Sequence, residues 1–350
     1  MSSHRRSPSF ADGMRAAASW VVDFFSLSWI VLGLLTSIFS FLACVLLLPR
    51  SPLAAFGLCV HLVALAVPLR VAPPRQARRL LHHVSSAACN YFPITVEFED
   101  KRAFKESRPC VIGYEPHSVL PIGACVFLPY SRVGQGGERP GQGFRGEAVP
   151  PFLRNSIMAS TSSVFLVPFM RHLLYWLGCR SASREVLQQA LADGKNVVLC
   201  PGGVQECYFM DPLPDQEVAF LKQRTGFVKL AMKAGAPLVP VFSFGQTQQY
   251  AYWRPFIDWP KHVISGGRMA SFVRRIGFVP LLCWGVMGTT LPHRVPMHIY
   301  VGKPIAVPHT ADPSAAEVQR YLKQYISAMT AIFERHKAAA GYPNAKLTII

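Results

Sequence analysis

The sequence predicts an α/β fold, a mostly parallel mixed sheet flanked by helices, preceded by an N-terminal transmembrane helical hairpin. Two observations carry this prediction. Beyond residue 70, short β-rich runs alternate with segments of helical spacing, which is typical of a layered fold with a largely parallel sheet. Before residue 70 lies a long apolar stretch with few charges. We therefore divide the chain into a cytosolic tail (1–20), a hairpin (21–70) and a cytosol-facing domain (71–350).

Composition limits the classes of protein to which the chain can belong. Of its 350 residues, 51% are hydrophobic and 16% are charged. This is too apolar for a typical soluble enzyme and too charged for a bundle made only of membrane spans. The formal net charge of +17 favours an anionic partner, such as a membrane face or a phosphorylated molecule. No spacing typical of nucleic-acid-binding modules occurs, so we expect no nucleic acid partner.

The N-terminal apolar stretch (24–69) contains a single charged residue, Arg50. Within it, Leu27–Leu48 is long enough for a helix to cross a hydrocarbon core of about 30 Å, whereas 51–69 is marginal for a second crossing. The turn Pro49–Pro52 separates the two segments. A cleaved signal peptide and a buried helix pair of a soluble domain are the alternatives. Arginines on both flanks predict that both ends are cytosolic: Arg5, Arg6, Arg15, Arg70, Arg75, Arg78 and Arg79.

After the hairpin, the segment 75–88 predicts a basic amphipathic helix, suited to an anionic membrane surface or else an ordinary solvated helix face. Two helices are predicted to end at glycine, one before Gly194 and one before Gly235. Residues 131–151 are rich in Gly and Pro and predict a surface loop, in which a GxGxxG match has no helix to follow it. The two helices predicted to end at glycine are 184–192 and 227–234, and the predicted strands are 94–97, 110–114, 196–200 and 237–244.

The C-terminal region predicts a long amphipathic helix. Asp312 is expected to cap its start, with Pro313 in its first turn. Apolar residues at helical spacing then mark the buried face: Val318, Leu322, Tyr325, Met329 and Ile332.

The chemistry begins where an apolar strand runs into a proline turn that presents Glu115, His117 and Ser118. A histidine on such a turn suits a general base, because its pKa lies near physiological pH; a purely structural histidine is the alternative. Ser118 does not lie in GxSxG, which disfavours a serine hydrolase. The histidine spacings match no metal-binding pattern, so we expect no metal.

These residues belong to a series of ordered blocks. Glu115–Ser118 reads Glu-Pro-His-Ser, and further blocks lie at Tyr91–Pro93, Val167–Arg171, Pro201–Glu206 and Arg224–Lys229. Together they resemble the type-2 diacylglycerol acyltransferase family, over roughly residues 20–310. The Glu-Pro-His-Ser form is similar to the plant-type branch, since animal and fungal members usually carry His-Pro-His-Gly.

The resemblance implies an activity and a fold like that of glycerolipid acyltransferases. We expect residues 71–350 to form an acyltransferase domain that makes triacylglycerol by direct transfer from acyl-CoA to the hydroxyl of diacylglycerol. His117 would be the base and Glu115 a second catalytic residue. No cofactor is implied, since acyl-CoA is a substrate. The expected substrate-binding residues are Pro116, Ser118, Gly202, Gly203, Glu206, Arg224, Gly226, Phe227 and Lys229.

Specific roles follow for part of this set. The amides of Gly202 and Gly203 could cradle the oxyanion or the substrate, a plain tight turn being the alternative. Arg224 and Lys229 could hold coenzyme A phosphates at the start of a helix. One departure from related soluble-type enzymes is that Ile122 stands where they carry the aspartate that orients the histidine. Glu115 and Glu206 are the candidates for that task.

The resemblance also implies a location in the endoplasmic reticulum membrane, as a multi-pass protein, and at the surface of lipid droplets. The sequence leaves the oligomeric state open, a homo-oligomer included. Two other functions compete. One is acylation of a monoacylglycerol or a fatty alcohol, since apolar sites discriminate such acceptors weakly. The other is a non-catalytic hairpin protein of lipid droplets, which leaves the ordered blocks without a role.

Overall fold

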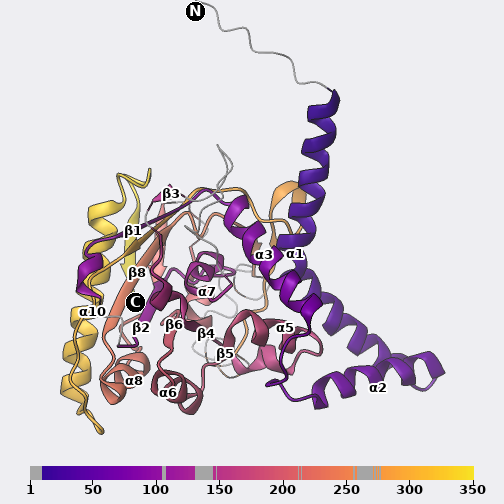
Figure 1. Ribbon diagram of the computed structural model, residues 1–350, viewed down its shortest axis with the longest axis horizontal. Helices are drawn as coiled ribbons and strands as arrows, with labels where there is room; N and C mark the ends of the chain where they lie inside the picture. Colours follow the sequence, from indigo (N-terminus) through magenta and orange to yellow (C-terminus); the bar gives the residue numbers. More distant parts are fainter. Residues whose placement is uncertain are drawn as a thin grey trace, which may run out of the picture.

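The structure is a computed structural model that describes residues 10–104, 108–130, 145–146, 148–211, 213, 215–254, 257, 271, 273, 275 and 277–350. Its centre is an eight-stranded sheet of order β3-β1-β11-β8-β2-β6-β4-β5 (Figure 1). Neighbours in this sheet pair in parallel, except for β11 and β8. The strands are β1 (Ile94–Phe98), β2 (Val111–Glu115), β3 (Arg145–Gly146), β4 (Ser156–Ser160), β5 (Cys179–Ser181), β6 (Asn196–Leu199), β8 (Leu238–Phe244) and β11 (Met297–Val301).

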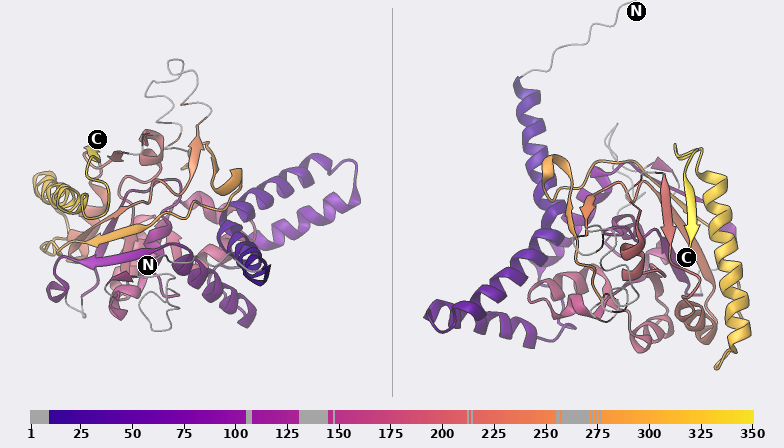
Figure 2. Two further views of the ribbon diagram at one scale, coloured as in Figure 1. Left: turned by 90° about the horizontal axis from the view of Figure 1, so that it is seen from above. Right: turned by 180° about the vertical axis from the view of Figure 1, so that it is seen from behind.

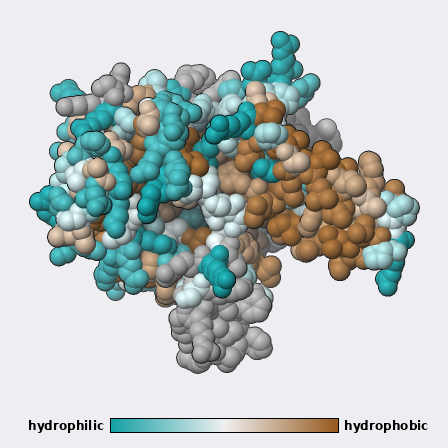
Figure 3. All heavy atoms as spheres, turned by 90° about the horizontal axis from the view of Figure 1, so that it is seen from below, coloured by the Kyte–Doolittle hydropathy of each residue, from teal (hydrophilic) through white to brown (hydrophobic). Residues whose placement is uncertain are grey.

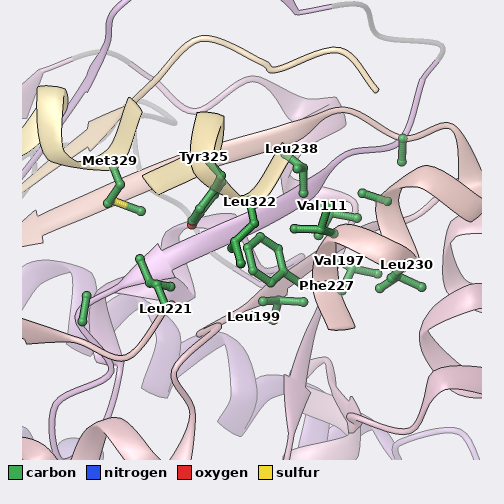
Figure 4. Close-up of a cluster of buried hydrophobic side chains, with 14 of the residues drawn as sticks. Val111, Val197, Leu199, Leu221, Phe227, Leu230, Leu238, Leu322, Tyr325 and Met329 are labelled. Atoms are coloured by element: carbon green, nitrogen blue, oxygen red, sulfur yellow. The ribbon is translucent and has the colours of Figure 1, made fainter. Parts of the chain in front are cut away.

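Helices cover both faces of this sheet, so the predicted mostly parallel α/β layer fold is confirmed. On one face lie α6 (Arg184–Ala192), α8 (Gly226–Ala234) and α10 (Ala315–His336). Their apolar side chains pack against those of β2, β6 and β8 (Figure 4). The base of α1 (Phe10–Leu47) and α3 (Arg75–Tyr91) pack on the other face, where the core includes residues of β1, β2 and β11.

Shorter elements complete the domain. Two small sheets form beside the main one, an antiparallel pair β9–β10 and a parallel pair β7–β12. These elements are η1 (Lys101–Ala103), η2 (Ile122–Phe127), α4 (Pro151–Arg154), η3 (Ser162–Leu166), α5 (Met170–Leu177), α7 (Val204–Phe209), β7 (Gln216–Ala219), β9 (Ala251–Trp253), β10 (Leu282–Trp284), η4 (Val286–Gly288) and β12 (Lys346–Ile349).

Three local predictions need correction. The C-terminal helix is capped by Ser314, which forms a capping box with Glu317, rather than by Asp312. The amphipathic helix α3 exposes its basic side chains, but its apolar face is buried within the protein instead of lying on a membrane. Within the predicted loop 131–151, β3 pairs with β1 and α4 begins at Pro151, while 131–144 lies outside the described residues.

The N-terminal region forms a pair of helices, α1 and α2 (Pro52–Ala66), that extends away from the domain (Figures 1 and 2). Residues 1–9 of the predicted tail lie outside the described residues, and α1 is already helical from Phe10. Within the described part of the chain, one helical segment, Phe24–Leu47, is long and apolar enough to cross a membrane. The 15 residues of α2 extend only about 22 Å, so the second crossing that the sequence left marginal is too short.

The family-like block 167–171 joins the hairpin to the domain. Ser37 of α1 donates a hydrogen bond to the Pro168 carbonyl at 2.7 Å, and Arg171 donates to the Leu65 carbonyl at the end of α2. Inside the hairpin, the buried His61 bonds to Ser40 at 3.0 Å. These contacts fix the direction in which the apolar hairpin leaves the domain.

Candidate active site

The two loops with the most distinctive sequences meet at one edge of the sheet. β2 and β6 are parallel neighbours, so their carboxyl ends lie side by side. Residues 116–118 follow β2, and the glycine turn 201–203 follows β6 and leads into α7. Sheet topology therefore brings His117 next to α7, although His117 and Cys207 of α7 are 90 residues apart in the sequence.

The ring of His117 is oriented by the backbone of the next residue. Its Nδ1 lies 2.8 Å from the Ser118 carbonyl oxygen. Because a carbonyl oxygen only accepts, Nδ1 carries a proton, and in the neutral ring Nε2 keeps the lone pair that a base needs. Ser118 has a positive φ of 55°, which turns its carbonyl back toward the ring. A backbone carbonyl thus takes the place of the aspartate that Ile122 replaces.

Glu206 holds the turn that carries His117. It is fully buried, and its Oε1 accepts a hydrogen bond from the backbone N–H of His117. Its Oε2 accepts from the backbone N–H of Phe220 at 3.4 Å. A side chain at position 202 would lie 2.3 Å from Oε2, which explains the glycine there. Glu206 therefore positions the backbone of the turn that carries His117. Its contact with a substrate stays a prediction.

Glu115 lies beneath the turn, with no exposed surface. Burial raises the pKa of its carboxyl well above the usual range, and the neighbouring Glu206 raises it further. Its neighbour is itself a carboxylate that can only accept, so a proton shared between the two groups satisfies both. The raised pKa favours the neutral form of Glu115, whose proton can be donated to Glu206. The described contacts of the His117 ring run to other groups.

This protonation state gives a prediction for Glu115. Glu115→Gln should keep turnover within about threefold of wild type, because the amide can donate to Glu206 as the protonated carboxyl does. Glu115→Ala is the matched control, which removes the donor and should cost more. Steady-state kinetics with both variants test this, and a fall of more than about a hundredfold in Glu115→Gln would show that the anionic carboxylate is required.

The glycine turn has the backbone that its sequence favours. Gly203 is the first residue before α7 and has φ 54° and ψ −145°, which only glycine adopts easily. Its amide donates to the Cys200 carbonyl at 3.0 Å, a contact within the tight turn. The predicted contact of Gly202 and Gly203 with an oxyanion or a substrate stays a prediction.

Three predicted residues lie on or before α8. The Arg224 guanidinium donates to the Gly202 carbonyl at 2.6 Å and lies over the Phe220 ring, so it stabilises the glycine turn, and its contact with a phosphate stays a prediction. Phe227 is buried against Tyr325 at 4.8 Å between ring centres, which gives it a packing role, and its contact with substrate stays a prediction (Figure 4). Lys229 is exposed on α8, where its phosphate contact stays a prediction.

The last two predicted substrate residues differ in their surroundings. Gly226 starts α8, is exposed, and has open space where a side chain would stand. Pro116 lines a narrow cavity under the catalytic turn together with Glu206, Glu217 and Thr247. Their contacts with substrate stay predictions.

Two functional candidates were missed from the sequence. The sulfur of Cys207 lies 3.1 Å from Nδ1 of His117. Glu217 on β7 is buried, accepts a hydrogen bond from the Thr247 hydroxyl at 2.8 Å, and has a pKa raised to about 8 by burial. The position of Cys207 beside Glu206 was the available signal, whereas no local pattern marks Glu217.

The basic residues between positions 259 and 311 are only partly described. Arg294 donates to the Tyr91 carbonyl at 2.8 Å, and Lys303 lies 3.8 Å from the Asp100 carboxylate. Both cations thus have partners within the protein. Lys261, Arg268 and Arg274 lie outside the described residues.

Comparison with known proteins decides the family. The family model described as diacylglycerol acyltransferase matches residues 45–350. The chain belongs to the diacylglycerol acyltransferase family. It is 31% identical over 268 residues to the mouse diacylglycerol O-acyltransferase 2-like protein 6, covering 72% of each chain. It is 28% identical to human diacylglycerol O-acyltransferase 2, a match that covers 74% of this chain and 64% of the human protein.

Two further proteins are similar to this chain, one in sequence and one in structure. The human 2-acylglycerol O-acyltransferase 3 is 29% identical over 263 residues, covering 73% of this chain and 71% of that protein. The crystal structure of the 1-acyl-sn-glycerophosphate acyltransferase PlsC from Thermotoga maritima aligns with 92% of this family member and 98% of that chain, at a TM-score of 0.41 and 11% identity. Assignment of the chain to the plant-type branch of the family stays a prediction from Glu115–Ser118.

Proposed function

We propose that the chain is an acyl-CoA-dependent diacylglycerol O-acyltransferase with His117 as its general base. Family membership supports the reaction class. The observation that carries the residue assignment is the bond between Nδ1 of His117 and the Ser118 carbonyl, which in the neutral ring leaves the lone pair on Nε2. A half-buried imidazole fixed in this tautomer is suited to accept a proton from a substrate hydroxyl.

The reaction follows from this geometry. Nε2 of His117 takes the hydroxyl proton as the hydroxyl oxygen attacks the thioester carbonyl of acyl-CoA. The tetrahedral intermediate collapses with cleavage of the carbon–sulfur bond, and the imidazolium returns the proton to the departing thiolate. The products are triacylglycerol and free coenzyme A, and no acyl group is attached to the protein.

A second acceptor class has specific support, since one relative is named as a 2-acylglycerol O-acyltransferase. The two readings are separated by incubating microsomes that express the chain with labelled acyl-CoA and, in turn, diacylglycerol, 2-monoacylglycerol or a fatty alcohol. We expect diacylglycerol to give the highest kcat/KM. Higher kcat/KM with another acceptor would transfer the assignment to that acceptor, and no product with any of them would favour a non-catalytic hairpin protein.

We also propose that the enzyme lies in the endoplasmic reticulum membrane through its hairpin, with both ends on the cytosolic side. The exposed side chains of α1 and α2 are predominantly apolar and form a continuous patch on the molecule (Figure 3). Because arginines flank both ends of the apolar stretch, the hairpin returns to the side from which it entered, and α1 does not cross the bilayer alone. Such an insertion also suits the single lipid layer of a lipid droplet.

The domain itself contributes to this apolar surface. Leu166 is 73% exposed beside the block 167–171, which contacts the hairpin, and Met287 of η4 is 87% exposed. η4 is anchored next to α1, since Val286 packs in the same cluster as Phe24 and Leu27 (Figures 1 and 2). This surface supports a catalytic domain held against the lipid from which its acceptor comes.

The hairpin topology gives a prediction. In sealed microsomes, an epitope tag at either end of the chain should be digested by added protease, because arginines flank both ends of the apolar stretch. The control is a lumenal marker that stays protected until detergent is added. Protection of one tag alone would show that the hairpin crosses the membrane an odd number of times.

The contacts of α8 give a prediction for acyl-CoA. Arg224→Gln should lower kcat with little change in the KM for acyl-CoA, because the guanidinium stabilises the glycine turn. Lys229→Gln should instead raise that KM about tenfold, because an exposed cation near a helix start can hold a phosphate. Lys233→Gln, one turn later on α8, is the matched control. If Arg224→Gln raises the KM and Lys229→Gln does not, the phosphate site lies at Arg224.

A further inference from the structure

The thiol of Cys207 lies in the site, but the reaction above gives it no role. It lies on α7, is 5% exposed, and follows Glu206, which holds the catalytic turn. Its sulfur is 3.1 Å from Nδ1 of His117 and 3.2 Å from the Ser118 carbonyl oxygen. The sulfur and the carbonyl thus contact the same edge of the imidazole.

This arrangement gives the ring proton two acceptors. Nδ1–H can be shared between the Ser118 carbonyl and the polarisable sulfur, while the thiol proton is directed to that same carbonyl. The sharing gains importance during catalysis. When Nε2 takes the hydroxyl proton, the ring becomes a cation, and an electron-rich sulfur beside it stabilises that charge.

We propose that Cys207 is a positioning residue for His117, whose sulfur fixes the imidazole ring and stabilises its protonated form during acyl transfer. The inference rests on the proposed function of His117 as base. It adds a side chain to the backbone carbonyl that orients the ring, and so completes the replacement of the missing aspartate at Ile122.

The geometry favours this task over a nucleophilic one. Cys207 contacts the Nδ1 edge of the ring, whereas the reacting hydroxyl must approach Nε2, at the other side of the ring. A sulfur that is also 95% buried beneath the turn cannot reach a thioester held at Nε2 without displacing the imidazole. Transfer of the acyl group through a Cys207 thioester is therefore the competing outcome of the test.

The contact has a measurable electrostatic consequence. Burial lowers the pKa of His117, but the neighbouring Cys207 sulfur, the Ser118 carbonyl and Glu206 raise it to about 9 overall. The other titratable groups packed around the site are Glu115 at the end of β2 and Cys200 after β6. A base works when unprotonated, so kcat/KM should rise about tenfold per pH unit up to about pH 9. Removing the sulfur should lower the pKa and move this rise to lower pH.

The test compares Cys207→Ala and Cys207→Ser with wild type, using the full chain reconstituted in lipid. In Cys207→Ala we expect the pH at which kcat/KM levels off to fall by about one unit, and kcat to fall about tenfold. The KM for acyl-CoA should stay within about twofold, and Cys207→Ser should lie between because its hydroxyl keeps an acceptor. Cys110→Ala, which removes a 2% exposed thiol before β2, is the control and should leave the profile unchanged.

A second measurement does not depend on activity. The pKa of His117, followed by NMR in histidine-labelled protein and assigned with His117→Gln, should fall in Cys207→Ala. An unchanged pKa together with an unchanged pH profile overturns the proposal while leaving His117 as base. An inactive wild type with a shifted pKa would instead overturn the proposed function and keep the contact. A thioester on Cys207, found by mass spectrometry after incubation with acyl-CoA alone, would replace positioning by nucleophilic catalysis.

Discussion

His117→Ala should lower turnover by about 10³-fold or more while the protein still inserts into membranes. A positioned general base contributes about 10²–10⁴-fold, and no other histidine lies on the described turns that directly follow β2 and β6. His117 makes its backbone contact with Glu206 through the main-chain N–H, which alanine keeps. The fold of the turn should therefore survive the substitution. Acyl transfer by reconstituted protein, normalised to inserted protein, measures the effect.

Two controls make this result specific. Added imidazole should restore part of the activity of His117→Ala, because it can occupy the vacated space and accept the proton. His172→Ala removes another buried histidine, on α5, and should leave turnover within a few-fold of wild type. Turnover of His117→Ala within about tenfold of wild type would remove His117 as the base.

Glu206→Ala should produce the largest loss of stability among single substitutions at the site. It leaves the buried backbone N–H groups of His117 and Phe220 without their acceptor, and it strands the acid proton of Glu115. Each buried donor left unpaired costs about 1–3 kcal/mol, so the two amides together cost about 2–6 kcal/mol. Activity should fall with stability, since the turn that carries His117 loses its support.

The matched variant is Glu206→Gln, which keeps one side-chain oxygen as an acceptor and offers an NH₂ group to Glu115. It should lose less than half as much stability as Glu206→Ala in thermal or denaturant unfolding. If both variants unfold like wild type, Glu206 does not hold the turn. If both are stable and inactive, Glu206 acts on the substrate directly.

The layered fold could be predicted because its strands are short, apolar and separated by helices with clear caps. β2, β6 and β8 and the helices α6 and α8 lie within one or two residues of their predicted bounds. The predicted start of α10 was wrong because Asp312–Pro313 carries the stronger local signal. The observed N-cap is Ser314, which is stabilised by its reciprocal hydrogen bonds with Glu317. The prediction of a second membrane crossing failed for a similar reason, since the sequence could not show that α2 ends at Ala66.

Less of the site could be predicted, because its side chains act on groups far away in the sequence. Arg224 looks like an anion-binding residue from its place before α8, and only the tertiary structure shows that the Gly202 carbonyl takes its guanidinium. The bond of Glu206 to a backbone amide 89 residues away leaves no local pattern. The role of His117, by contrast, could be proposed because strand, turn and histidine are contiguous.

The central claim is that this chain transfers an acyl group directly from acyl-CoA to diacylglycerol with His117 as base. The most direct test is triacylglycerol formation by the purified, reconstituted chain, followed together with coenzyme A release in the presence and absence of diacylglycerol. We expect the two products to form in equal amounts, only when diacylglycerol is present, and at a rate at least about 10³-fold lower in His117→Ala. Coenzyme A release without acceptor, at the rate of the full reaction, would contradict direct transfer, and equal rates for the two proteins would contradict the base.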